Sequence, residues 1–178
     1  DFLVALFEQT APDFASGRPP DTLAVLSRGA ARVHRELAGE PALAAELLHV
    51  IGGAQRRLGD YAASREQLLA AHELGRRHGL PASARGLTML QLGALGVDTG
   101  RLDDAADWLA RARDTLAGLD EPAARSALAH VHLHLGNLAL LRGEQERALA
   151  ELARAEAIES TLAPETETRA RARLQAEA

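Results

Sequence analysis

The sequence predicts an all-α fold in which helical hairpins stack into a right-handed superhelix, an α-solenoid, and three observations support this prediction. First, small residues recur at spacings of 41 and then 43 residues, in the sets Gly52, Gly93 and Gly136, then Gly59, Gly100 and Gly143, then Ala71, Ala112 and Ala155. Second, amphipathic helical patterns flank each glycine turn, and such repetition is typical of stacked hairpins because one hairpin cannot bury its apolar face alone. Third, the chain is 47% hydrophobic but only 3% aromatic, so alanine and leucine must fill the core and permit close helix packing.

Residues 1–40 are predicted to form an atypical N-terminal cap and linker. An apolar face over residues 2–7 indicates a short helix, and the Pro- and Gly-containing residues 10–20 indicate a loop. Asp21 is the predicted N-cap of a helix that keeps apolar residues at helical spacing as far as Leu37. Gly39 and Pro41 end this helix, and the whole segment lacks the glycine-centred first helix of the repeat.

Three hairpins follow, over about residues 41–80, 81–121 and 122–163. We place their first helices at about 42–57, 82–98 and 123–141, and their second helices at about 61–78, 102–118 and 145–160. Each first helix begins at or near a proline, which a first helical turn tolerates, and each second helix begins with acidic residues, which favour the positive end of the helix dipole. Residues 164–178 are expected to be the first helix of a truncated further repeat, so the sequence is interpreted as an excised piece.

The three helix pairs share a code of large, small and apolar residues at positions four, seven, eight, eleven, twenty, twenty-four and twenty-seven of each pair. The residues at these positions are Leu48, Ile51, Gly52, Gln55, Ser64, Leu68 and Ala71, then Met89, Leu92, Gly93, Gly96, Ala105, Leu109 and Ala112, then His132, Leu135, Gly136, Ala139, Ala148, Leu152 and Ala155. This code resembles that of tetratricopeptide repeats, although the aromatic residue of position eleven is absent. The period exceeds the usual length of about 34 residues and overlaps that of HEAT and armadillo arrays. We favour the tetratricopeptide assignment because the extra residues lie between the pairs.

A second resemblance covers about residues 1–75. The segment DFLVALF at residues 1–7, Arg28-Gly29-Ala30 and Glu36-Leu37 are similar to the junction found in bacterial serine/threonine protein kinases that carry C-terminal tetratricopeptide repeats. The resemblance implies a kinase domain and one membrane-spanning helix N-terminal to this chain. It further implies that the repeats lie on the extracytoplasmic face of the inner membrane; without that arrangement we expect a cytoplasmic location.

Composition argues against several classes of function. The chain has 25 acidic and 20 basic residues, a net charge of −5 and no basic run, which argues against nucleic acid as a partner. All the basic residues are arginine, so no P-loop lysine, Schiff base or kinase lysine is available. There is no cysteine, no run of eighteen apolar residues that could insert into a membrane, and no Gly-x-Ser-x-Gly motif. We expect no catalytic residue, cofactor or metal in this fragment.

Two histidine patterns leave a metal-binding helical domain as an alternative. His130, His132 and His134 alternate, and the outer two lie one helical turn apart, a spacing that can chelate zinc or nickel. His132 falls on a large packing position, which favours ordinary, partly buried histidines. Glu46 and His49 form a single Glu-x-x-His, a motif that diiron bundles need twice.

The favoured function is a protein-protein interaction module that binds a peptide or protein segment in a concave groove, as the sensor or scaffold arm of such a kinase. In tetratricopeptide superhelices first-helix positions two, five, nine and twelve form this groove. The groove residues here are Glu46, His49, Gly53 and Arg56, then Leu87, Leu90, Ala94 and Val97, then His130, Leu133, Asn137 and Leu140. We expect Leu87, Leu90, Val97 and Leu133 to anchor a segment between the polar edges Arg56 and His130. A signalling ATPase or transcription regulator, self-association through an oligomerisation arm, and filling of the groove by further repeats are the alternatives.

Overall fold

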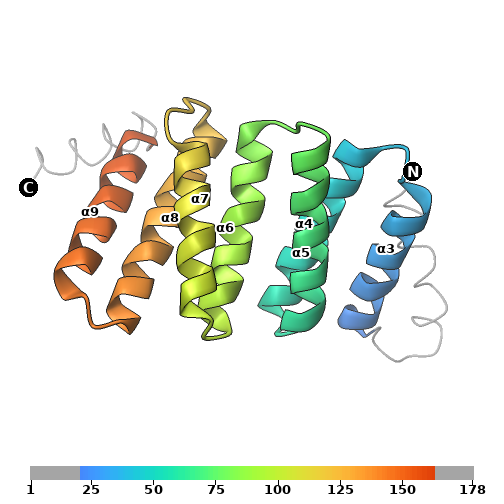
Figure 1. Ribbon diagram of the computed structural model, residues 1–178, viewed down its shortest axis with the longest axis horizontal. Coiled ribbons are helices and arrows are strands. Elements are labelled where there is room, and N and C mark those ends of the chain that lie inside the picture. The colour runs from blue at the N-terminus through green and yellow to red at the C-terminus, as the bar shows by residue number, and fades with distance from the viewer. Residues whose placement is uncertain (1–20, 163–178) are drawn as a thin grey trace, which may run out of the picture.

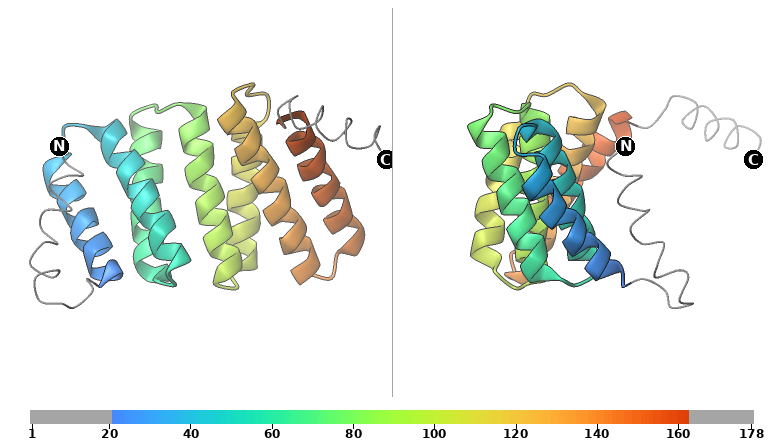
Figure 2. Two further views of the ribbon diagram at one scale, coloured as in Figure 1. Left: turned by 180° about the vertical axis from the view of Figure 1, so that it is seen from behind. Right: turned by 90° about the vertical axis from the view of Figure 1, so that its right-hand side faces the viewer.

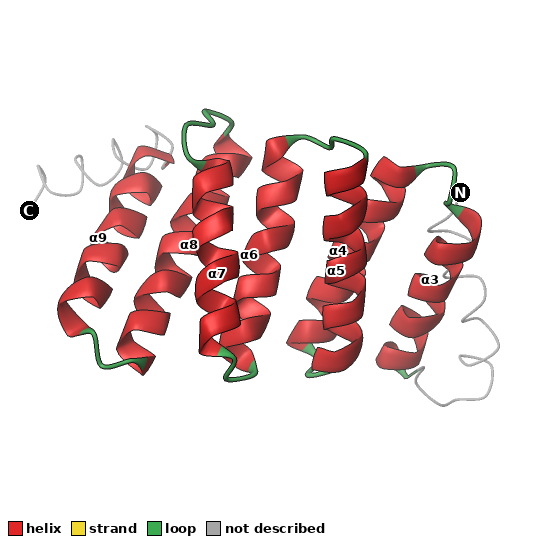
Figure 3. Ribbon diagram, viewed as in Figure 1, coloured by secondary structure: helices red, strands yellow, loops and turns green. Residues whose placement is uncertain are grey.

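A computed structural model describes residues 21–162, in which every regular element is an α-helix. The helices are α3 (Thr22–Glu36), α4 (Pro41–Arg57), α5 (Tyr61–Arg77), α6 (Ala82–Asp98), α7 (Leu102–Leu116), α8 (Pro122–Leu141) and α9 (Gln145–Leu162). The all-α prediction is confirmed for this part of the chain (Figure 3). The helix and loop predicted within residues 1–20, and the helix predicted at 164–178, lie outside the described residues.

The helix pairs follow one another along one elongated row, from α3 at one end to α9 at the other (Figure 1). The closest packing is within the successive pairs α4 and α5, α6 and α7, and α8 and α9. The first helices of these pairs, α4, α6 and α8, also contact each other in turn, and α3 packs against α4 at the N-terminal end of the row. Seen along the row, the helices form two layers (Figure 2).

Proline and aspartate define the helix starts much as predicted. Pro41 and Pro122 occupy first-turn positions, and Pro81 is the N-cap of α6. The Asp21 carboxylate accepts a hydrogen bond from the Leu23 amide at 3.1 Å, which confirms it as the N-cap of α3. For all six helices predicted from residue 41 onward, both the start and the end agree with the structure to within two residues.

The turn inside each pair explains one set of recurring glycines. Gly59, Gly100 and Gly143 adopt φ angles of 83°, 70° and 76°, which other residues seldom do. The residue after each glycine donates its amide to a carbonyl near the helix end, at 2.8 to 2.9 Å, in the bonds Asp60 to Gln55, Arg101 to Gly96 and Glu144 to Ala139. This is the Schellman arrangement, which ends a helix and lets the next one fold back.

Close contact between paired helices explains the other glycine set. A Cβ atom at Gly52, Gly93 or Gly136 would lie 2.8, 2.6 or 3.0 Å from the Cγ atom of a leucine on the second helix, respectively Leu68, Leu109 and Leu152. Each glycine therefore lets a leucine of the partner helix approach its backbone. Gly53 differs from its neighbour Gly52, since a Cβ there would meet only ordinary contacts, the nearest at 3.6 Å.

The core consists of three clusters along the row and is built mostly from alanine and leucine, as composition predicts. Its central part joins α6, α7 and α8, and includes Leu109 and Leu116, which are both fully buried. A second cluster joins α3 to α4 and α5 through Val33 and Leu48. Trp108 on α7 contacts both the central cluster and a smaller one around Leu68 and Leu95.

Candidate functional site

The residues predicted to form a groove all lie on α4, α6 and α8, but they differ in exposure. On α8 all four are exposed, whereas on α6 Leu87 and Val97 are half-buried. Leu90 is only 7% exposed and belongs to the central core cluster, and Ala94 is also buried. The prediction that Leu90 offers its side chain to a partner is therefore wrong.

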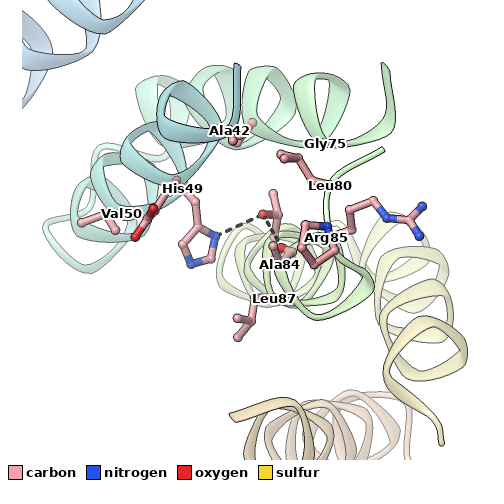
Figure 4. A pocket seen from close by; sticks show the side chains of 13 residues that line it. Ala42, His49, Val50, Gly75, Leu80, Ala84, Arg85 and Leu87 are labelled. Carbon is pink, nitrogen blue, oxygen red and sulfur yellow. Dashed lines mark hydrogen bonds between the residues drawn. The ribbon is translucent and has the colours of Figure 1, made fainter. Parts of the chain in front are cut away.

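The structure brings Glu46, His49 and Leu87 together in one pocket of about 420 Å³. The pocket lies between α4, the C-terminal end of α5 and the first half of α6, and Figure 4 shows side chains from these elements around it. Small and aliphatic side chains form most of its wall. The lining residues are Ala42, Ala45, Glu46, His49, Val50, Ala71, Gly75, Leu80, Pro81, Ala84, Arg85, Leu87 and Thr88.

His49 is the polar centre of this pocket. Its Nδ1 atom lies 3.3 Å from the Thr88 hydroxyl, and that hydroxyl donates to the carbonyl of Ala84 at 3.1 Å. Since a hydroxyl has one hydrogen, we assign the imidazole proton to Nδ1, which leaves the Nε2 lone pair free to accept. Burial lowers the pKa of His49 below its ordinary value, and the nearby Glu46 carboxylate opposes this shift.

Glu46 and Arg85 are the two formally charged residues of the pocket lining. Glu46 is exposed, and it makes no ion pair or hydrogen bond to any other residue of the part that the structure describes. The Arg85 side chain extends away from His49 (Figure 4), and its Nε atom is buried. Of the two charged lining residues, Glu46 is therefore the one whose charge acts on His49.

Arg56 links two first helices and is not a free edge of the groove. Its guanidinium donates to Asp98 at 2.6 Å and to the side-chain oxygen of Gln91 at 3.2 Å, both on α6. His134 on α8 lies in the same electrostatic environment. Burial is the main cause that lowers the pKa of His134, and Arg56 lowers it further, while Asp98 acts in the opposite direction.

The exposed side of α8 carries a mixed apolar and polar stripe. Leu133 is 40% and Leu140 is 53% exposed, and His130 and Asn137 lie exposed on the same helix face. These residues have the same register positions as the predicted groove residues of α4 and α6. We call His130, Leu133, Asn137 and Leu140 the α8 stripe.

The three alternating histidines have three different surroundings. His130 is exposed, His134 is half-buried, and buried His132 shares a hydrogen bond of 2.7 Å between its Nδ1 atom and the Glu151 carboxylate on α9. Glu151 also accepts from Arg154 at 2.7 Å. Over residues 21–162 no group of three or more His, Cys, Asp or Glu side chains is arranged to hold a metal ion.

Several polar residues of this face were not predicted from the sequence. Thr88, Gln91 and Asp98 each contact a groove residue of the preceding first helix. The sequence indicates them only by the fact that they are polar residues on a largely apolar helix, α6. Each contact joins residues 35 to 42 positions apart, so the pairing becomes visible only once the helices are stacked.

No protein-family model matches the chain, and no curated protein is significantly similar to it. Among the helices of residues 21–162, none is long and apolar enough to cross a membrane.

Proposed function

We propose that this chain is a non-catalytic protein-binding module, a tetratricopeptide-like right-handed superhelix that holds a segment of another protein against its first helices. The α8 stripe carries this proposal. Two leucines stand exposed there, and burying each against a partner is worth about 1.5–3 kcal/mol. Asn137, between them, offers an amide that can both donate to and accept from a peptide backbone.

The kinase attribution is part of the proposal and rests on the resemblance of the N-terminal residues. We propose that the module is the sensor or scaffold arm of a bacterial serine/threonine kinase, on the extracytoplasmic side of the inner membrane. The gene sequence upstream of Asp1 tests this directly: kinase motifs followed by one apolar span support it. An upstream sequence without them contradicts the attribution and leaves the binding proposal standing.

The binding proposal is tested with the double variant Leu133→Asp, Leu140→Asp. We expect the wild-type module to capture partner proteins that the double variant loses, because two carboxylates would be desolvated at the contact. The matched control is Leu149→Asp on α9, where a leucine that is 69% exposed lies outside the stripe. A photo-cross-linking residue placed at Asn137 identifies what lies on the stripe.

Circular dichroism must first show that the double variant keeps its helical fold. If the folded double variant retains every partner, the α8 stripe is not the binding surface. If the cross-linked partner is a second copy of the chain, and sedimentation shows a dimer, the module is an oligomerisation arm instead.

A further inference from the structure

We propose that the pocket between α4 and α6 is a binding site for an amphipathic organic cation, an apolar group that ends in an ammonium or guanidinium. The apolar part would lie against the aliphatic wall, and the cationic end would be held between Glu46 and the Nε2 atom of His49. The cation is either a free amine or a basic side chain of a bound peptide. This inference does not depend on the α8 stripe, which lies on a different helix.

The size and composition of the pocket favour a small organic group over water or an ion alone. Its volume of about 420 Å³ lies within the range of about 300–1,000 Å³ that is usual for small-molecule sites. Ala45 on α4, Ala71 on α5, Leu80 in the connection between α5 and α6, and Leu87 on α6 provide apolar surface. Such sites combine apolar walls with a few polar groups that fix the orientation of the ligand.

The polar groups of the pocket favour a ligand that donates hydrogen bonds and carries a positive charge. Nδ1 of His49 is engaged with Thr88, so Nε2 is the ring nitrogen that can accept a hydrogen bond from a ligand. Glu46 precedes His49 by three residues on α4, which places both side chains on one face of the helix. Both acceptors are therefore available to a single ammonium or guanidinium, and hydrogen bonds of this charge-assisted kind are the strong ones.

Arg85, the other charged residue of the lining, does not oppose this assignment. Its side chain extends away from His49 (Figure 4). The Arg85 Nε atom is buried and makes no hydrogen bond within the described residues. Since the charge that acts on His49 is that of Glu46, the His49 end of the pocket favours a cation over a carboxylate or a phosphate.

The test is a titration of the full chain, residues 1–178, with three probes. Binding is monitored by two-dimensional NMR and by calorimetry. The probes are 2-phenylethylamine, 3-phenylpropionate as an anion of similar size, and the blocked peptide acetyl-Ala-Phe-Arg-Ala-amide. We expect the amine or the peptide to shift the resonances of His49, Thr88 and Leu87, and the anion to leave them unchanged. Which of the two cations binds identifies the source of the ligand.

Two variants with matched controls make the assignment specific. Glu46→Gln should weaken cation binding by about tenfold, because the amide keeps an acceptor oxygen but removes the charge that strengthens the hydrogen bond to a cation, whereas Glu66→Gln on the exposed surface of α5 should not change it. Ala42→Trp should fill the pocket and abolish binding, while Ala62→Trp, also at an exposed first-turn alanine, should not. Equal binding of the anion, unchanged binding by folded Glu46→Gln, or no pocket resonance shifted by either cation would overturn the proposal.

Discussion

Glycines within the first helices have different surroundings, and these predict opposite effects of adding one methyl group. In Gly93→Ala the new Cβ atom would lie 2.6 Å from Cγ of Leu109 and 3.3 Å from the Leu109 backbone nitrogen. Helix α7 would have to move, so we expect the free energy of unfolding to fall by about 1–3 kcal/mol through overpacking. Urea unfolding measured by circular dichroism gives this change.

Gly53→Ala is the matched control in the neighbouring pair. No atom lies closer than 3.6 Å to the new Cβ, and alanine is the better helix former by about 0.5–1 kcal/mol. This variant should therefore be as stable as the wild type or more stable. Equal stability of both variants would contradict the close approach of α6 and α7 at Gly93.

Close helix contacts at glycines could be predicted from the sequence where the glycine recurs in every pair, but not where it occurs in one pair alone. The recurrence of Gly52, Gly93 and Gly136 correctly indicated close helix contact. Gly86 allows a still tighter contact, with a Cβ atom there lying 2.5 Å from Cγ of Leu116, yet the corresponding residues in the other pairs are Ala45 and Ala129. A contact that occurs once has no signal in a repeat pattern.

We expect the free energy of unfolding to fall in mild acid, because three histidines are packed between neighbouring helices. Burial lowers the pKa of His49, His72 and His134 below 6.5, and Arg111 lowers that of His72 further. The unfolded chain then binds more protons than the folded chain at pH values below about 6.5. The stability that these neutral histidines contribute is complete above that pH and is lost as the pH falls toward their folded pKa values.

Urea unfolding at pH 7.5, 6.5 and 5.5 should accordingly show decreasing free energies of unfolding. The double variant His49→Gln, His134→Gln should depend less on pH, whereas His78→Gln, at an exposed helix end, should behave like the wild type. Glu73 affects stability only at lower pH. Hydrogen bonds from Arg76 and Arg77 hold its pKa at about 2, against an ordinary value of 4.5. A pH-independent stability between 7.5 and 5.5 would show that the three histidines are solvated.

At the scale of elements, the sequence predicted helix limits well and helix faces less well. The limits depend on Pro41, Gly59 and similar local signals, which act within one turn of the chain. Exposure of a face depends on what stacks against it. Leu90 and Leu133 have the same register position, but Leu90 is covered in the central core and Leu133 is exposed. For the same reason, the contact of Arg56 with Asp98 could not be predicted from the sequence, since it forms only when α4 and α6 are packed side by side.

Over residues 21–162 the molecule is a row in which each helix packs chiefly against its neighbours, so within this part α3 and α9 have fewer contacts than α6. Helix α6 buries nine of its residues and contacts helices on several sides, including α4, α5, α7 and α8. Helix α9 buries three residues, and its contacts within residues 21–162 are chiefly with α8. Stability in such quasi-one-dimensional arrays is close to a sum of local and nearest-neighbour terms.

Native-state hydrogen exchange should therefore show a gradient along the row. We expect amides of α6 and α7 to be the most protected, because opening them disrupts the central cluster around Leu109 and Leu116. Amides of α9 and α3 should exchange faster, through local opening that leaves the centre folded. Leu116→Ala, which empties a fully buried site, should lower protection in the centre by about 2–5 kcal/mol, while Leu149→Ala at the exposed surface of α9 should not. Equal protection in α3, α6, α7 and α9 would mean that the row unfolds as one cooperative unit, because the nearest-neighbour contacts would then be too strong for the ends to open separately.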